Sequence, residues 1–276
     1  MGNKTKIDWC DSTWNPVTGC RHGCEYCYAR GIANRFRDRK RHEINEDNVI
    51  FIHHFDGTPT NYELNKQCYY DKIDDLDRIP TSIKAPYPYG FAPTFHRYRL
   101  NDYIEKKGRN IFVCSMADLF GAWVPLEWQR EVFAACRKAP QHNYIFLTKN
   151  PGMYAVLDKQ GELPTDSNMW FGTSVTTPDD PFPYNGKAKH NLFLSMEPLL
   201  ADFGVGQGEA LKGIGWVIIG AETGRRKGKI VPEKSWVDNI VEQCKALNIP
   251  VFMKESLRAL YGDNLLREFP QGLIRG

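Results

Sequence analysis

The chain has 276 residues, of which 42% are hydrophobic and 25% are charged, and its net charge at pH 7 is +3. This composition is typical of a soluble globular protein, and the weak positive charge allows nucleic acid as a partner without arguing strongly for it. The sequence contains no run of 18 apolar residues and therefore predicts no membrane span. Its N-terminus has no apolar signal-peptide core. We therefore expect a cytoplasmic protein with reduced thiols and no membrane partner.

The first informative segment in chain order is residues 19–29, GCRHGCEYCYA. It contains Cys20, Cys24 and Cys27, three of the eight cysteines of the chain, in the spacing C-x3-C-x2-C. In a reducing compartment, clustered cysteines more often bind metal or carry out redox chemistry than form disulfides. The segment therefore predicts a metal or redox site.

Residues 42–88 follow, and they interrupt the pattern of the rest of the chain. They contain VIFIHHF, DGTPTNYE and the acidic DKIDDLDR. We interpret this segment as an insertion, and residues 1–276 as a single domain that carries it.

Short apolar runs rich in β-branched and aromatic residues dominate the remaining chain, and they predict strands buried on both faces. They lie at residues 111–115, 144–148, 169–175, 192–196, 216–220 and 250–253. Helical patterns occur between them at residues 125–139 and 235–248, the second with Ser235 as N-cap candidate. The alternation predicts an α/β fold with six to eight mostly parallel strands, favouring a partial or full TIM-type barrel over a doubly wound open sheet.

Polar groups recur where each apolar run stops. In a barrel the chemistry lies at the carboxyl ends of the strands. Helix capping by Ser, Thr or Asp is a common alternative explanation, but it accounts less well for the charged Lys149, Glu197, Glu222 and Lys254. We therefore expect these charged groups to contribute to one site.

The cysteine segment is compatible with two kinds of metal site. A structural zinc site needs four ligands, and here only His22 lies between the three cysteines, while Cys10 or Cys68 would have to come from elsewhere. A 4Fe-4S cluster fits better, because each thiolate ligates one iron and three ligands leave the fourth iron open. An open coordination position is a property of catalytic metals, so the cluster would be catalytic.

The C-x3-C-x2-C spacing, with the aromatic Tyr26 directly before Cys27, resembles the signature of the radical S-adenosylmethionine (SAM) superfamily. The resemblance implies a partial or full TIM-type barrel whose first strand is residues 14–19. It also implies that SAM binds the open iron and is cleaved to a 5′-deoxyadenosyl radical, with flavodoxin or ferredoxin as electron donor. Tyr26 then belongs to the cofactor site.

Further segments resemble a phage-associated radical-SAM family of unknown function, which is distantly similar to spore photoproduct lyase, a DNA-repair enzyme. These segments are residues 7–20, 93–100, 111–120, 146–151, 193–200 and 217–224. The resemblance implies SAM contacts for Ser115, Lys149 and Ser174, and an adenine contact for Glu222. A lysine ammonium suits the SAM carboxylate.

Cys114 lies at the end of the predicted strand at residues 111–115, where the lyase has a cysteine that returns a hydrogen atom to the product radical. The resemblance makes Cys114 a candidate hydrogen donor. The alternative, which we favour, is a small buried hydrophobic residue, as most free cysteines are.

Basic and aromatic residues mingle in three stretches, at residues 35–42, 87–100 and 224–229. Such stretches can stack bases and contact phosphates, although many charge runs are only solvated helix faces. Nucleic acid is therefore the favoured substrate, and a peptide or a small molecule are alternatives.

Taken together, the sequence predicts an enzyme that cleaves SAM at a 4Fe-4S cluster on Cys20, Cys24 and Cys27 and starts repair or modification of nucleic acid. The alternative from another class is an iron–sulfur or zinc protein that binds nucleic acid without turnover. No P-loop, GxSxG or HExxH motif is present, so ATPase, serine-hydrolase and zincin functions have no support.

Overall fold

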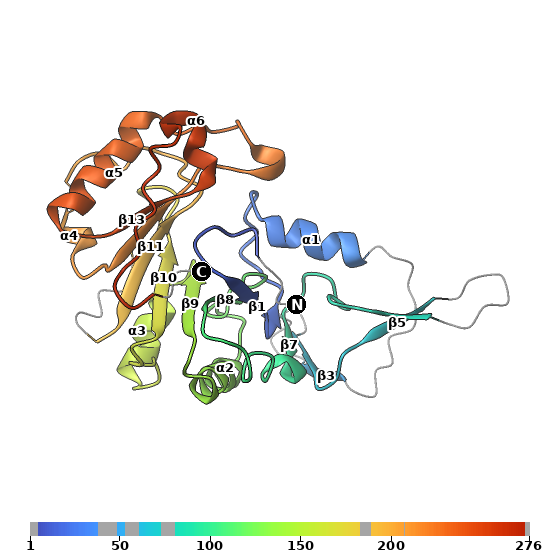
Figure 1. The fold of residues 1–276 in the computed structure, drawn as a ribbon. Coiled ribbons are helices and arrows are strands. Elements are labelled where there is room, and N and C mark those ends of the chain that lie inside the picture. Colours follow the sequence, from blue (N-terminus) through green and yellow to red (C-terminus); the bar gives the residue numbers. More distant parts are fainter. Residues whose placement is uncertain are drawn as a thin grey trace.

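A computed structural model of the protein describes residues 5–37, 49–52, 61–72, 81–182, 189–206 and 208–273. A seven-stranded sheet forms its main body, a four-stranded sheet lies beside it, and a two-stranded hairpin extends from the latter (Figure 1). The order of the large sheet is β1-β8-β9-β10-β11-β12-β13, and every neighbouring pair is parallel.

The large sheet is an open half-barrel, which confirms the predicted partial TIM-type barrel. Its strands are β1 (Ser12–Trp14), β8 (Asn110–Val113), β9 (Asn143–Thr148), β10 (Met169–Ser174), β11 (Asn191–Met196), β12 (Trp216–Ile219) and β13 (Val251–Met253). Six of them match the apolar runs in the sequence. Continuous apolar runs predicted these strands well because a parallel sheet in this architecture is buried on both faces.

The prediction of one first strand over residues 14–19 was wrong. The chain forms β1 and then a separate β2 (Val17–Thr18), which pairs with the small sheet. Asn15 and Pro16 separate them. The Asn15 Oδ1 atom accepts hydrogen bonds from the Met116 amide and the Ser115 hydroxyl, at 2.9 and 3.1 Å, and proline has no amide hydrogen to donate to a sheet.

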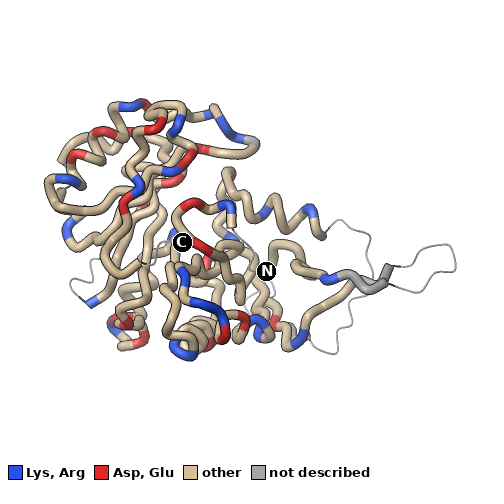
Figure 2. Tube along the Cα trace, viewed as in Figure 1, with Lys and Arg blue, Asp and Glu red and all other residues tan. Residues whose placement is uncertain are grey.

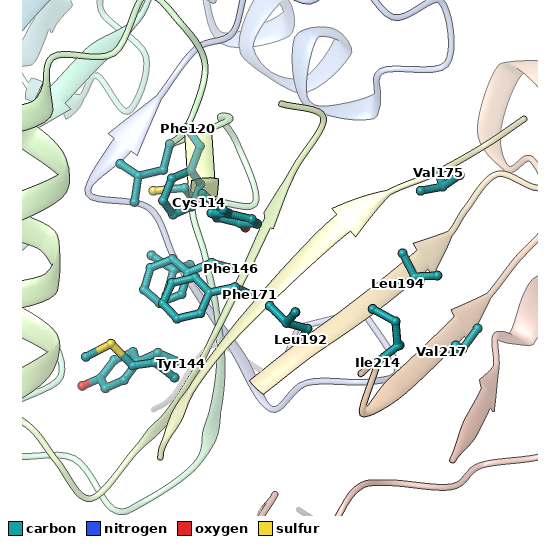
Figure 3. Packing of buried hydrophobic residues seen from close by; sticks show 14 of the residues in the cluster. Cys114, Phe120, Tyr144, Phe146, Phe171, Val175, Leu192, Leu194, Ile214 and Val217 are labelled. Atoms are coloured by element: carbon teal, nitrogen blue, oxygen red, sulfur yellow. The ribbon is translucent and has the colours of Figure 1, made fainter. Parts of the chain in front are cut away.

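Helices cover one face of the half-barrel. They are α2 (Leu126–Lys138), α3 (Gly152–Lys159), α4 (Gly208–Leu211) and α5 (Lys234–Ala246), and the short α6 (Arg258–Tyr261) follows β13. Both predicted helices are confirmed, but Ser235 lies inside α5 and Glu233 is its N-cap. The main core lies between these helices and the sheet, and stacked Phe146 and Phe171 lie near its centre (Figure 3).

The opposite face of the half-barrel, here called the inner face, has its own apolar layer. Alternate strand residues form it because successive side chains of a strand point to opposite faces. Its buried members are Trp9, Phe112, Ile145, Trp170, Phe193, Trp216, Ile218, Phe252 and Leu273. Trp9 comes from the N-terminal segment and Leu273 from the C-terminal segment, so the two ends of the chain cover the amino-terminal part of this face.

The small sheet has the order β2-β7-β4-β3, with β3 (Val49–Ile52), β4 (Asn61–Leu64) and β7 (Thr94–His96). The hairpin consists of β5 (Tyr69–Lys72) and β6 (Thr81–Lys84). The described parts of the proposed 42–88 insertion thus form β3 to β6. Glu63 of β4 joins this sheet to the main body, since its carboxylate accepts hydrogen bonds from Trp128 Nε1 and Arg97 Nη1, both at 2.6 Å.

No helix in the described residues combines the length and the apolar character that crossing a membrane requires. The helix that follows the three cysteines, α1 (Tyr28–Arg37), lies outside the barrel beside the small sheet (Figure 1).

Candidate functional site: the cysteine loop at the carboxyl edge of the half-barrel

Polar residues replace the apolar layer at the carboxyl end of the inner face. Counting in steps of two from the buried inner-face residues Ile145, Trp170, Phe193 and Phe252 leads to Lys149, Ser174, Glu197 and Lys254. All four are half-buried. The alternation of the strands therefore places these four residues at one edge and on one face, and that they contribute to one functional site stays a prediction.

The three cysteines lie in the loop at residues 19–27, between β2 and α1 (the cysteine loop). Its first residues are tied to the sheet edge, because the Gly19 amide donates to the Met116 carbonyl at 2.9 Å and the Cys20 amide to the Phe91 carbonyl at 3.3 Å. Gly19 has φ +88°, and a Cβ there would lie 2.2 Å from the Ala92 carbonyl oxygen. Only glycine fits this position, which sets the direction in which the loop leaves the sheet.

Asp118 is the main anchor of the cysteine loop. Its buried carboxylate lies 2.7 Å from His22 Nε2 and accepts hydrogen bonds from Thr148 Oγ1 and from the amides of Phe120 and Lys149. The His22 ring also contacts the Trp123 ring, at 4.8 Å between ring centroids. One carboxylate thus fixes the loop relative to the ends of both β8 and β9.

The three thiols are free and half-buried. Within the described residues, no group of three or more Cys, His, Asp or Glu side chains is close enough together to hold a metal ion. The number and type of donors thus fit an iron–sulfur cluster, but the sulfurs are not arranged as a ready-made ligand set. Cluster binding would have to draw the thiols together, so that binding and ordering of the loop are coupled.

Tyr26 and Lys149 face each other across the cysteine loop and the end of β9. The Lys149 ammonium lies 5.1 Å from the centroid of the Tyr26 ring, within the range of a cation–π interaction. Burial raises the pKa of the Tyr26 hydroxyl, although hydrogen bonds with Lys149 and Thr176 oppose the increase. Within the described part of the chain, Lys149 forms no salt bridge, although its charge helps to lower the pKa of the Asp180 carboxyl. The ammonium can therefore still pair with an anionic ligand.

Ser115 and Ser174 differ in the contacts that surround their hydroxyls. The Ser115 hydroxyl donates to Asn15 Oδ1 at 3.1 Å, while its carbonyl accepts from the Tyr28 hydroxyl at 2.7 Å. Ser174 is paired in register with Ser195 of β11 and lies half-buried on the inner face. Both remain predicted ligand contacts.

Glu222 forms an ion pair with Arg226, and this arginine links two distant parts of the chain. Its side chain is fully buried and accepts from Arg226 Nε at 2.6 Å and from the Ile230 amide at 3.3 Å. Arg226 Nη1 in turn donates to Glu25 of the cysteine loop at 2.5 Å. The Glu222 carboxylate therefore positions Arg226, and the predicted adenine contact would have to compete with that interaction.

Glu197 and Lys254 form an ion pair on the inner face. Gly220 lies between them, and a Cβ there would be 3.1 Å from both side chains. The charge of Lys254 is thus neutralised within the protein, which distinguishes it from Lys149.

Cys114 is buried in the core beneath the helices, next to Phe120 (Figure 3). Burial raises the pKa of its thiol to about 12. It has a left-handed backbone, with φ +58°, and its amide donates to the Trp14 carbonyl at 2.7 Å. This environment is that of a small buried hydrophobic residue, the alternative that we favoured from the sequence.

Four residues of the site carried no assigned role in the sequence analysis: Asn15, Glu25, Asp118 and Arg226. Asp118 follows the apolar run of β8 in the sequence, and that position was its only signal. The contact between Arg226 and Glu25 joins residues 201 positions apart, and nothing local in the sequence indicates it.

Cys20 makes the metal chemistry of the loop dependent on pH. Burial raises the pKa of its thiol to about 12, and the charge of Asp118 adds to the increase. Only the thiolate binds metal or reacts with alkylating agents, so Cys20 must lose its proton first. In the metal-free protein, we expect the iodoacetamide reaction of Cys20, followed by peptide mass spectrometry, to accelerate about tenfold per pH unit from pH 7 to 10. A plateau before pH 9 would contradict the raised pKa.

The comparisons with known proteins give one match. A family model described as "Protein of unknown function (DUF5131)" matches residues 4–258, which is most of the chain. No curated protein and no solved structure matches the chain.

These findings correct the resemblance that the sequence analysis drew to the radical SAM superfamily, to a phage-associated member family and to spore photoproduct lyase. The matching family is a different one, and the described residues contain no assembled metal-binding group. The assignment from the cysteine spacing was wrong. Three closely spaced cysteines limit the chemistry that a loop can carry out, but they say much less about the family to which a chain belongs. The chain belongs to the DUF5131 family.

Proposed function

We propose that the protein is an enzyme that holds a 4Fe-4S cluster on Cys20, Cys24 and Cys27 and uses it to cleave SAM reductively, with nucleic acid as substrate. One observation carries the proposal. Three free, half-buried thiols share one loop at the carboxyl edge of a half-barrel, beside a lysine that forms no salt bridge with a carboxylate of the described residues.

The side chains of the loop are of the type that binds such a cluster. Cysteine thiolates are the usual ligands of iron–sulfur clusters, and three of them leave one iron for an exogenous ligand. A 4Fe-4S cluster held by Cys20, Cys24 and Cys27 would supply the single electron for reductive cleavage of the SAM carbon–sulfur bond, which yields methionine and the 5′-deoxyadenosyl radical that abstracts hydrogen from the substrate. A flavodoxin- or ferredoxin-type donor would return the electron.

The protein's own residues would bind and orient the ligand. Lys149 offers an ammonium to the SAM carboxylate, and Tyr26 limits its movement from one side. Asp118 holds the Lys149 amide and His22 together, so the cation and the cysteine loop keep a fixed relation. The apolar layer beneath them keeps water from the amino-terminal part of the inner face.

Lys149→Met should weaken SAM binding by about 10- to 100-fold, because a charge-assisted hydrogen bond is lost. Iron content should stay unchanged, since Lys149 provides no metal ligand. Calorimetric titration of the anaerobically reconstituted protein with SAM measures the affinity. Lys254→Met is the matched control, since it removes a lysine of the same face whose charge Glu197 already neutralises. Equal effects of the two substitutions would remove the special role of Lys149.

Metal analysis and electron paramagnetic resonance test the proposal itself. Anaerobic reconstitution should give about four irons per chain with matching sulfide. The dithionite-reduced protein should show a cluster signal that changes shape when SAM is added. One zinc and no iron would overturn the proposal, and a cluster signal that ignores SAM would leave an iron–sulfur protein with a different ligand.

A further inference from the structure

The sequence indicated the aromatic and basic stretch at residues 87–100 as a candidate nucleic-acid surface. In the structure, its basic side chains make contacts within the protein instead. Arg97 pairs with Glu63 and Glu131, at 2.6 and 2.7 Å. Arg99 donates to backbone carbonyls, among them that of Asn15 at 2.9 Å. His96 is completely buried. A surface for phosphates must therefore come from other basic residues.

Two other basic segments border the cysteine loop. Helix α1, directly after the loop, contains three arginines and no acidic residue. The segment at residues 223–230, after β12, contains four basic residues and no acidic one, and Arg226 ties it to Glu25 of the loop. Figure 2 shows separate blue positions along α1 and a longer blue part in the segment after β12. The side chains of Arg35, Lys227 and Lys229 are exposed, and Lys229 also lies 3.7 Å from the exposed Glu25 carboxylate, a surface pair that contributes little.

Tyr28 is the first residue of α1 and directly follows Cys27 of the cysteine loop. Its side chain is 54% exposed, the largest exposed fraction of any aromatic residue among those that the structure describes. Its hydroxyl is nevertheless fixed, because it donates to the Ser115 carbonyl at 2.7 Å. An exposed ring held in one position is suited to stack against a planar group.

We propose that Tyr28 and the two basic segments form a binding surface for single-stranded nucleic acid. The lysines would contact phosphates, and the Tyr28 ring would stack on a base. A single strand is favoured over a duplex because the polar edge of the inner face lies behind this surface. A base in a duplex would have to leave the base stack before it could reach the polar edge of the inner face. That this nucleic acid is the substrate rests on the proposed function, but the binding surface does not.

Binding is measured on the metal-free protein, so that the result does not depend on the cluster or on SAM. Fluorescence anisotropy with a fluorescein-labelled 20-nucleotide oligo-dT reports the affinity, with the 20-base-pair duplex and the equivalent RNA in parallel. Lys227→Glu/Lys229→Glu should weaken single-strand binding at least about tenfold and flatten its dependence on salt. Tyr28→Ala should weaken it about tenfold, and Tyr28→Phe, which keeps the ring, should weaken it less.

The matched control is Lys106→Glu/Lys107→Glu. It makes the same change in charge on two exposed lysines just before β8, at the opposite edge of the sheet. Affinity within about twofold of the unaltered protein is expected for it. An equal loss in both double variants would show a general effect of charge and overturn the surface. Tighter binding of the duplex, or no binding at low salt, would overturn the proposal, whereas failed cluster assembly would overturn only the proposed function.

Discussion

Cys24→Ala should abolish iron binding. We expect the reconstituted protein to retain less than about one iron per chain instead of about four, and to lose the brown absorbance and all SAM cleavage. The reason is local, because the loop has no further cysteine that could replace the lost ligand. Iron and sulfide analysis, together with the absorbance spectrum, measures the effect without depending on turnover.

Cys10→Ala is the informative control for this experiment. Cys10 is a free, half-buried cysteine like the three in the loop, and it packs against the apolar layer of the inner face. Iron content should stay near the unaltered value. Retention of a complete cluster in Cys24→Ala would refute the ligand assignment, and loss of iron in Cys10→Ala would identify a fourth protein ligand and close the iron position on which SAM cleavage depends.

Glu63→Ala should cost about 1–3 kcal/mol of unfolding free energy, because it leaves the buried Trp128 indole N–H without its acceptor, while Arg97 keeps its pair with Glu131. The Glu63 side chain is only 10% exposed, and it joins β4 of the small sheet to α2 of the half-barrel. Denaturation in urea, followed by circular dichroism, should show a lower midpoint. Glu63→Gln keeps an acceptor for Trp128 and should lose less.

Glu162→Gln provides the comparison for the Glu63 substitution. It also removes a carboxylate from an arginine pair, that with Arg130 at 2.7 Å, but both side chains lie at the surface. Exposed pairs contribute little, so the urea midpoint should hardly move. If Glu63→Ala were equally mild, the small sheet would be held to the half-barrel by apolar packing alone.

The half-barrel could be predicted from the sequence because its strands are buried on both faces and follow one another as separate apolar runs. WVII of β12 is one such run, with Trp216 and Ile218 on the inner face and Val217 and Ile219 under the helices. The start of the chain gave no comparable pattern. Its β1 and β2 have three and two residues, and they belong to different sheets.

The candidate site could be predicted only in part, for a related reason. The three cysteines are neighbours in sequence, and Lys149 follows directly after a strand, so both have local signals. Asp118 and Arg226 act through contacts with His22 and Glu25, which lie 96 and 201 positions away. Such contacts depend on the assembly of the half-barrel, and no periodicity in the sequence encodes them.

The link between Arg226 and Glu25 also sets an order of events during synthesis. A chain leaves the ribosome from its N-terminus, so the three thiols emerge long before the strands that complete the sheet. Asp118 can reach His22 after 96 further positions have been made, and Arg226 can reach Glu25 only after 201. The cysteine loop thus lacks its final surroundings until the later strands of the sheet have been made.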